Sequence, residues 1–152
     1  MFTLFRRKSI ALFSTEEKET IAAAISQAEQ KTSGEIRVFI ENKCRFVDAT
    51  DRAAELFWQL QMQNTNARNG VLLYLAIEDR QLAIWGDQGI HDKLGSDYWT
   101  KQVSLISSAF NQNNYTLGLC QCIHQIGKAL EMHFPYQGDA DKNELDNEVV
   151  FG

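Results

Sequence analysis

Three observations predict a three-layer α/β/α sandwich around a small mixed β-sheet. An alternating segment (residues 35–41) and a continuous apolar run (residues 71–77) are separated by an amphipathic segment with helical spacing. A third apolar segment (residues 82–85) follows after a short polar turn. Strands on either side of a helix are joined in parallel by a right-handed crossover, whereas a tight turn joins antiparallel strands. We therefore expect a parallel crossover plus an antiparallel hairpin.

Composition and length indicate one domain with short extensions. The chain has 152 residues, 44% of them apolar, and a formal net charge of −5. That length suffices for one substantial core. A net acidic chain without a Lys/Arg stripe repels phosphate backbones, so we expect no nucleic-acid partner. We divide the chain into an N-terminal arm (1–13), an α/β domain (14–135) and an acidic C-terminal tail (136–152), whose apolar end is expected to dock as a short strand.

The cysteine count and the hydropathy pattern predict a cytoplasmic protein. Cys44, Cys120 and Cys122 are too few, and odd in number, for a disulfide framework, which indicates a reducing compartment. The apolar run after the basic residues 6–8 is too short for a signal-peptide core. No later segment approaches the roughly 18 apolar residues of a membrane-spanning helix, so we expect no membrane anchor.

The first half of the chain predicts two helices and two strands. Ser14 and Glu17 have the spacing of a capping box, so the first helix should begin at Ser14, and Gly34 is expected to end it in the left-handed conformation. Residues 35–41 then alternate as a strand. A second helix is expected over residues 51–62. The apolar run 71–77 predicts a central strand covered on both faces.

The second half predicts one more strand and two helices. Residues 78–80 form a plausible tight turn into the antiparallel strand 82–85, which the segment Gly86-Asp87-Gln88-Gly89 should end. Ser96 is expected to cap a helix. The last helix should run from about Tyr115 and stop before Pro135, because proline cannot continue a helix.

This topology collects candidate metal ligands at one end of the sheet. Residues that enter the first two strands and residues that leave the third share that end. They include Glu35, Asn69, Asp87 and Asp92, with Ser96 and Asp97 nearby. Hard divalent cations prefer carboxylate, amide and carbonyl oxygens, so the sequence predicts a site for a divalent cation, calcium or magnesium, at this end. Asp97 and Asp79 are secondary candidates.

Two alternatives to this site remain open. Asp and Asn are also favoured in turns and helix caps, where they form local hydrogen bonds. The opposite end of the sheet collects its own acidic residues: Glu41, Asp48, Asp51, Glu78 and Asp79. Ligands of open α/β sheets often bind beyond the carboxyl ends of parallel strands, so that end is the rival location.

Several common catalytic and metal-binding motifs are missing from the sequence. Asp139, Asp141 and Asn143 resemble the start of a calcium loop, but Glu144 stands where the loop needs Gly. Cys120 and His124 supply only two zinc ligands on one helix. No Cys-x5-Arg cradle and no Gly-x-Ser-x-Gly elbow is present, and no Asp-x-Asp motif follows an apolar strand. If the protein hydrolyses phosphate esters, metal-activated water is the remaining route.

An ordered set of short motifs resembles the TPM-domain family. The set comprises Ser33-Gly34-Glu35-Ile36-Arg37-Val38, Asn69-Gly70-Val71-Leu72-Leu73-Tyr74-Leu75, Asp79-Arg80, Ile84-Trp85-Gly86-Asp87-Gln88-Gly89-Ile90 and the later Phe110-x4-Tyr115-x2-Gly118-Leu119. The resemblance covers about residues 14–134 and is nearest to the short, soluble bacterial branch. It implies an α/β/α fold, divalent-ion binding in some members and acid-phosphatase activity in plant relatives. Carried over by motif, the candidate positions are again Glu35, Asn69, Asp87 and Asp92.

These observations leave two functional hypotheses. The first is a metal-dependent phosphatase acting on phosphate monoesters, in which Asp87, Asp92 and Glu35 hold the ion and Asn69 orients substrate or water. The second is a non-catalytic calcium-binding or protein-interaction module that uses the same residues. The sequence assigns no catalytic residue, and it names neither the phosphate ester nor the protein partner.

Overall fold

The central sheet has the mixed topology predicted from the sequence. The computed structural model describes residues 13–45, 48–112, 114–138 and 149–152. In this part of the chain the strand order is β3–β2–β1–β4, with β1 at Glu35–Glu41, β2 at Gly70–Ala76, β3 at Gln81–Gly86 and β4 at Val149–Phe151. β1 is parallel to both β2 and β4, whereas β2 and β3 form an antiparallel hairpin. The short strand expected at the end of the tail is therefore β4.

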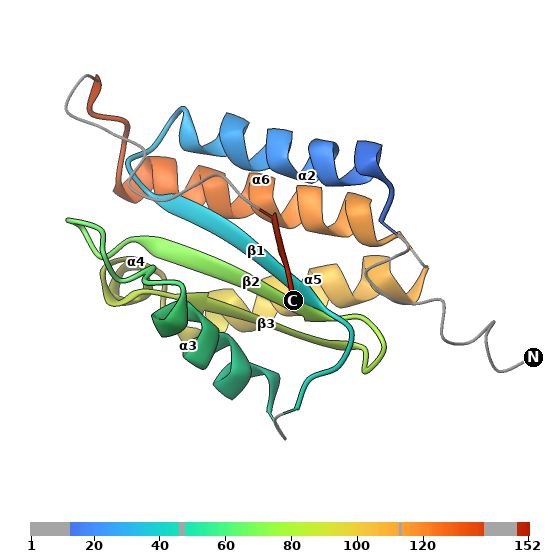
Figure 1. The fold of residues 1–152 in the computed structure, drawn as a ribbon. Helices are drawn as coiled ribbons and strands as arrows, with labels where there is room; N and C mark the ends of the chain where they lie inside the picture. The colour runs from blue at the N-terminus through green and yellow to red at the C-terminus, as the bar shows by residue number, and fades with distance from the viewer. Residues whose placement is uncertain (1–12, 46–47, 113, 139–148) are drawn as a thin grey trace, which may run out of the picture.

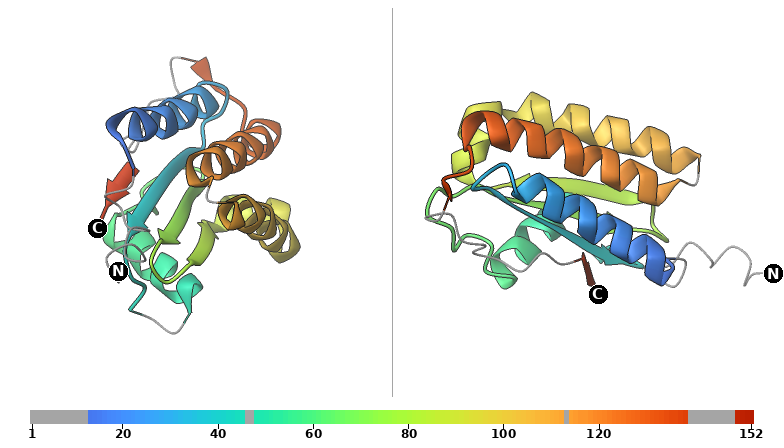
Figure 2. Two further views of the ribbon diagram at one scale, coloured as in Figure 1. Left: turned by 90° about the vertical axis from the view of Figure 1, so that its right-hand side faces the viewer. Right: turned by 90° about the horizontal axis from the view of Figure 1, so that it is seen from above.

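Helices cover both faces of the sheet and complete the α/β/α sandwich. Helices α2 (Thr15–Glu29), α5 (Ser96–Asn111) and α6 (Tyr115–His133) lie together on one face, and α3 (Ala49–Gln59) lies on the other (Figures 1 and 2). Ile36, Val38 and Ile40 of β1 point toward the three-helix face, where the larger core forms. Phe57 of α3 packs with Tyr74 in the smaller core on the opposite face.

The first helix begins as predicted but ends for a different reason. The Ser14 side chain accepts from the Glu17 N–H, and the Glu17 carboxylate accepts from the Ser14 N–H, which forms the capping box. The helix ends at Glu29, and Gly34 does not have a positive φ. The prediction for Gly34 was therefore wrong. A Cβ there would collide with the side chain of Leu130, so glycine permits close packing between this segment and α6.

The helix predicted over residues 51–62 spans Ala49–Gln59 instead. It begins earlier because Asp48 is its N-cap and accepts from the Thr50 N–H at 2.8 Å. It ends earlier because the chain turns at Gln61, which has a φ of 57°. A left-handed residue cannot continue a right-handed helix.

The segment after β3 contains a helix that the sequence analysis missed. β3 ends at Gly86 as expected, but Asp87 then caps the short helix α4 (Gln88–Leu94). Gly95, with a φ of 81°, separates α4 from α5. Ser96 is the first residue of α5 and makes no side-chain cap bond, so the cap predicted there was wrong. The following helix α6 begins at Tyr115, as predicted.

The described residues bear only in part on the predicted extensions. Phe13, the last residue of the predicted arm, is buried against Tyr115 and Phe151. Residues 1–12 and 139–148, which include most of the arm and the segment compared with a calcium loop, lie outside the described residues. None of the described helices is both long and apolar enough to cross a membrane.

Candidate functional site

The strand ends that carry the candidate ligands are neighbours in the sheet. The Glu35 N–H donates to the Asn69 carbonyl at 3.4 Å, which joins the starts of β1 and β2. The Asp87 N–H donates to the Gly70 carbonyl at 2.8 Å, which places the end of β3 beside the start of β2. The topological prediction that these three strand ends lie at one end of the sheet is thus confirmed.

The Asp87 carboxylate is already engaged by the protein. Its Oδ2 accepts from Arg68 Nε at 2.6 Å, and its Oδ1 accepts from Arg68 Nη2 and from the Gln88 N–H at 2.7 and 2.8 Å. The Asp87 side chain is 4% exposed, whereas that of Arg68 is 42% exposed. The hydrogen bonds to Asp87 and the negative charge of that carboxylate raise the pKa of the Arg68 guanidinium. Both carboxylate oxygens therefore have charged or capping partners.

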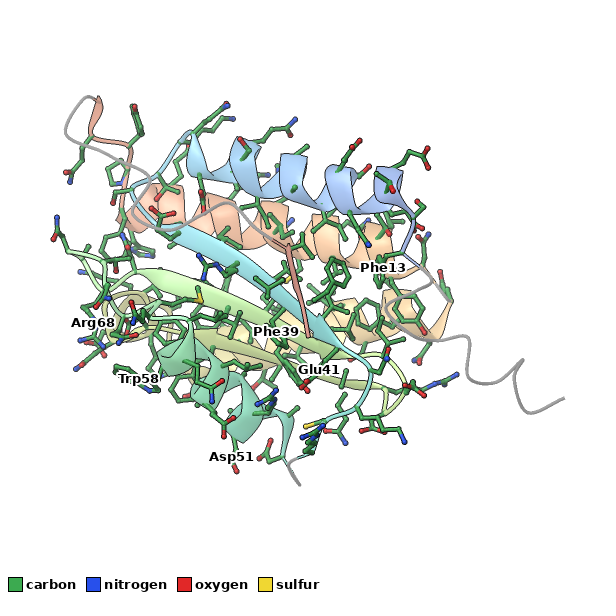
Figure 3. All side chains as sticks on the ribbon, in the orientation of Figure 1. Phe13, Phe39, Glu41, Asp51, Trp58 and Arg68 are labelled. Carbon is green, nitrogen blue, oxygen red and sulfur yellow. The ribbon has the colours of Figure 1, made fainter. Side chains whose placement is uncertain are left out.

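Arg68 is positioned by the chain segment that precedes β2. Its backbone has a φ of 52°, and its guanidinium lies 5.9 Å from the ring centre of Trp58 on α3. Figure 3 shows Arg68 and Trp58 near one another at the same end of the molecule. The contact has cation–π geometry and holds the arginine over the indole while it binds Asp87.

Hydrogen bonds within the protein satisfy the Asn69 side chain only in part. It is buried, and its Nδ2 donates to Ser33 Oγ at 3.2 Å. Its Oδ1 is buried without a hydrogen-bond partner among the described groups. A buried carbonyl oxygen that lacks a donor costs free energy, so this atom is the strongest structural indication of an additional ligand at this end.

Glu35 faces a second carboxyl group, that of Glu29 at the end of α2. Glu29 Oε2 accepts from the Ile36 N–H at 2.7 Å, and the two carboxyl groups also hydrogen-bond to one another. Burial, followed by repulsion from Glu35, raises the pKa of Glu29 from 4.5 to about 9. At neutral pH this pair therefore holds a proton between its two carboxyl groups.

The remaining candidates do not complete a ligand set. Asp92 and Asp97 are exposed on α4 and α5, and Asp79 lies at the opposite end of the sheet, where it accepts from the Cys44 N–H at 2.7 Å. In the part of the chain that the structure describes, no three His, Cys, Asp or Glu side chains converge as metal ligands. As arranged, these residues do not fit a preformed cation site.

The rival end of the sheet is also organised by internal contacts. Glu41 accepts from Arg52 Nε and Nη2 at 2.9 and 3.0 Å, and from the Tyr74 hydroxyl. Burial opposes ionisation of Glu41, but the hydrogen bonds from Arg52 and Tyr74 outweigh it and lower its pKa. Figure 3 shows Glu41 on the sheet and Asp51 further out on α3, away from Arg68.

The cysteines give no support for a zinc site. Cys122 is buried, and burial raises the pKa of its thiol to about 12. Cys120 is half-buried, and His124 is exposed. Of the two cysteines on α6, only Cys122 is buried.

A cavity of about 730 Å³ lies beside the free edge of β3, between α3 and α5. We call it the edge cavity. Five consecutive residues of β3 line it (Leu82, Ala83, Ile84, Trp85, Gly86), together with Trp58 and Thr50 of α3, Arg68 and Asp87, Gln88, His91 and Asp92 of α4, and Ser96, Trp99, Thr100 and Val103 of α5. The predicted residues Asp87 and Asp92 thus both line the edge cavity.

The one histidine in the edge cavity has a fixed role. His91 Nδ1 accepts from Trp99 Nε1 at 3.0 Å. A neutral imidazole that accepts at Nδ1 carries its proton on Nε2. In this arrangement the indole N–H uses the Nδ1 lone pair, so His91 helps to position Trp99.

A comparison with protein-family models now decides the family, because the model for the TPM domain matches residues 8–129. The chain belongs to the TPM-domain family. A comparison with curated proteins finds no match.

Three solved structures share the fold of this TPM domain. The BA42 protein from the psychrophilic bacterium Bizionia argentinensis is 41% identical, with a TM-score of 0.84 over 92% of this chain and 95% of its own. N-terminal domains of cg2496 from Corynebacterium glutamicum and of a protein from P. gingivalis are 16% and 18% identical, each with a TM-score of 0.64. These two matches cover 80% and 82% of this chain, and 76% and 82% of theirs, and show the fold alone.

The sequence analysis missed the residues that organise this end of the TPM domain. Arg68 precedes Asn69-Gly70 and therefore had to lie at the same end of the sheet as Asp87, so the topology could have suggested their pairing. Trp58 and Trp99 belong to none of the candidate sets named from the sequence. Glu29 gave no signal, because its contact with Glu35 depends on where α2 ends.

The Arg68–Asp87 pair can be separated from the helix cap by two substitutions. Asp87→Asn keeps a capping oxygen but removes the charge that binds Arg68, whereas Asp87→Ala removes both. We expect both variants to be less stable than the wild type. The free energy of unfolding of the alanine variant should be about 1 kcal/mol lower than that of the asparagine variant, which is the typical contribution of an N-cap. Urea unfolding would measure the difference.

The control is Asp92→Asn, because exposed Asp92 should change stability by less than about 0.5 kcal/mol. Wild-type stability in both Asp87 variants would contradict the structural role of the pair.

The shared proton predicts how stability depends on pH. The pKa of Glu29 is raised in the folded state, so its contribution is complete below pH 4.5 and is lost as pH rises toward about 9. We expect Glu29→Gln to remove up to about 1.4 kcal/mol per pH unit of this slope, the value for one proton. Urea unfolding at pH 5 to 9 would measure it. Glu19→Gln, on an exposed position of the same helix, should leave the slope unchanged; an unchanged slope in Glu29→Gln would refute the shared proton.

Proposed function

We propose that this TPM domain is a non-catalytic protein-interaction module and that the edge cavity is its binding site. The observation that carries the proposal is the composition of the cavity. Its volume of about 730 Å³ is within the usual range for ligand sites, and indole rings from α3, β3 and α5 line it. Exposed aromatic side chains at the rim of a pocket are typical of binding surfaces.

The polar groups that line the cavity favour binding over acid–base catalysis. The carboxylate of Asp87 is paired with Arg68, and His91 Nδ1 accepts from Trp99. General-base or nucleophilic catalysis needs a base within hydrogen-bond reach of the group that it activates. The remaining hydroxyl groups, such as those of Ser96 and Thr100, are exposed and have no such base in the described contacts.

This proposal predicts that phosphate monoesters are not turned over. With p-nitrophenyl phosphate as the probe, we expect the same background hydrolysis for the wild type and for the double variant Asp87→Asn/Asp92→Asn. The assays would be run with a chelator, with calcium and with magnesium, at acidic and neutral pH. Ion-dependent hydrolysis that the double variant loses would overturn the proposal. It would support the metal-dependent phosphatase, in which the ion activates water.

A divalent cation is the second candidate ligand, and one observation favours it. The buried Asn69 Oδ1 has no described hydrogen-bond partner, and an amide oxygen is a suitable ligand for calcium or magnesium. Asp87 could add an oxygen only by giving up a contact with Arg68 or the Gln88 N–H, and ligation by Glu35 would disturb its contact with Glu29. Binding of an ion here would therefore be coupled to a rearrangement of both pairs.

A titration of chelator-treated protein with calcium or magnesium, followed by heteronuclear NMR, tests this candidate. We expect saturable amide shifts at Glu35, Asn69 and residues 86–92, weakened in Asp92→Asn but not in the control Asp97→Asn. Shifts centred instead on Glu41, Asp48, Asp51, Glu78 and Asp79 would move the ion to the rival end of the sheet. No saturable shift at either end would remove the candidate.

A further inference from the structure

The outer side of β3 is an open sheet edge. In the part of the chain that the structure describes, β3 is the last strand of the sheet and pairs only with β2. The Asp87 N–H donates to the Gly70 carbonyl, so the backbone of residue 87 is directed toward β2. Backbone direction alternates along an antiparallel ladder. The N–H and C=O groups of Leu82, Ile84 and Gly86 therefore point away from β2, into the edge cavity.

This edge lacks the features that usually prevent additional strands from pairing. Proteins protect edge strands by making them short, by placing charges or proline in them, or by inserting a bulge. β3 has the sequence QLAIWG, with neither a charge nor a proline, and its six residues keep regular register with β2. At the other edge, β4 has only three residues. The two edges of the sheet thus differ in their capacity to accept a strand.

The walls of the edge cavity fit the side chains of a strand bound to β3. Side chains of a strand alternate between the two faces of a sheet. On one face they would contact Trp58, which is 51% exposed, and the half-buried Trp85. On the other face they would contact Val103 and Trp99 of α5. Apolar or aromatic residues at alternate positions would bury surface on both sides.

The charges in the cavity indicate where the bound segment is basic. Arg68 and Asp87 neutralise one another through their bidentate pair. Asp92 is exposed, and no described Lys or Arg forms an ion pair with it. Asp92 therefore adds an exposed carboxylate to the lining of the cavity, and the whole chain is also acidic, at −5. A Lys or Arg in the ligand would complement this carboxylate.

We propose that the edge of β3 binds an extended peptide segment of a partner protein, with alternating apolar residues and a Lys or Arg beside Asp92. The peptide adds a strand to the sheet, a recognition mode in which backbone hydrogen bonds give affinity and side-chain pockets give specificity. The inference rests on the proposed binding function of the edge cavity and specifies its partner.

A second copy of this chain does not fit the same site. The edge of β3 lies in a hollow between α3 and α5, which both contribute to the walls of the cavity. In two copies paired edge to edge, the strand beside Asp92 would be QLAIWG, which has no Lys or Arg, and each copy carries a net charge of −5. A single extended segment has no flanking layers and can enter the hollow.

The test begins with a phage-displayed library of random heptapeptides selected on the full chain. We expect enrichment of sequences with alternating β-branched or aromatic residues and a Lys or Arg at one end. The enriched synthetic peptide should shift the amide signals of Leu82, Ile84 and Gly86 and the indole signals of Trp58 and Trp85. No enrichment, shifts remote from β3, or formation of a dimer through β3 would overturn the proposal.

Two matched comparisons distinguish strand addition from binding by side chains alone. N-methylation of a peptide amide that pairs with β3 should weaken binding about tenfold or more, because it removes a backbone hydrogen bond and adds bulk at the edge. Asp92→Asn should weaken binding about two- to fivefold, as for an exposed ion pair, whereas Asp97→Asn should not.

These outcomes separate the inference from the proposed function on which it rests. Binding in the edge cavity that is insensitive to N-methylation would refute strand addition but leave the binding module intact. Ion-dependent phosphatase turnover that needs Asp87 and Asp92 would refute the non-catalytic function itself, whether or not the peptide binds at β3.

Discussion

The bidentate pair between Arg68 and Asp87 determines how the end of the sheet is built. The pair joins the segment before β2 to the first turn of α4, and Asp87 caps that helix with the same carboxylate. Backbone bonds reinforce it, because the Gly89 N–H donates to the Arg68 carbonyl at 2.8 Å. A Cβ at Gly89 would collide with the carbonyl of Ala67, so only glycine allows the two segments to lie this close. Arg68 and Asp87 line the edge cavity, so the shape of this part of the cavity depends on the contact between the segment before β2 and α4. The contact of Arg68 with Trp58 depends on it as well.

Burial explains why the pair is asymmetric. Asp87 is almost fully enclosed, and a lone buried carboxylate is costly, so its ionised form needs the guanidinium. Arg68 keeps access to solvent and spreads its planar group between the carboxylate and an indole, which a lysine could not do. The geometry thus gives a neutral surface at the centre of the site and leaves Asp92 as its exposed charge.

The sequence predicted those features that depend on local pattern and chain order. Alternation at Ile36, Val38 and Ile40 and the apolar run of β2 gave the strands, and the crossover rule gave their directions. These rules also placed Glu35, Asn69 and Asp87 at one end of the sheet. The sequence did not predict α4, because a seven-residue helix between two glycine-containing turns has too little periodicity. It also did not predict the partners of Glu35 and Asp87, since long side chains select partners through three-dimensional packing.

The location of β3 between α3 and α5 has a consequence for how the protein behaves at high concentration. An uncharged six-residue edge is a template for intermolecular sheet growth when it is fully exposed. Here residues of α3 and α5 form walls of the cavity beside this edge. Among the described residues α3 is the helix on its face of the sheet, so its local unfolding would remove one wall beside the edge. Aggregation through β3 is therefore expected to depend on the local stability of α3 as well as on the global free energy of unfolding.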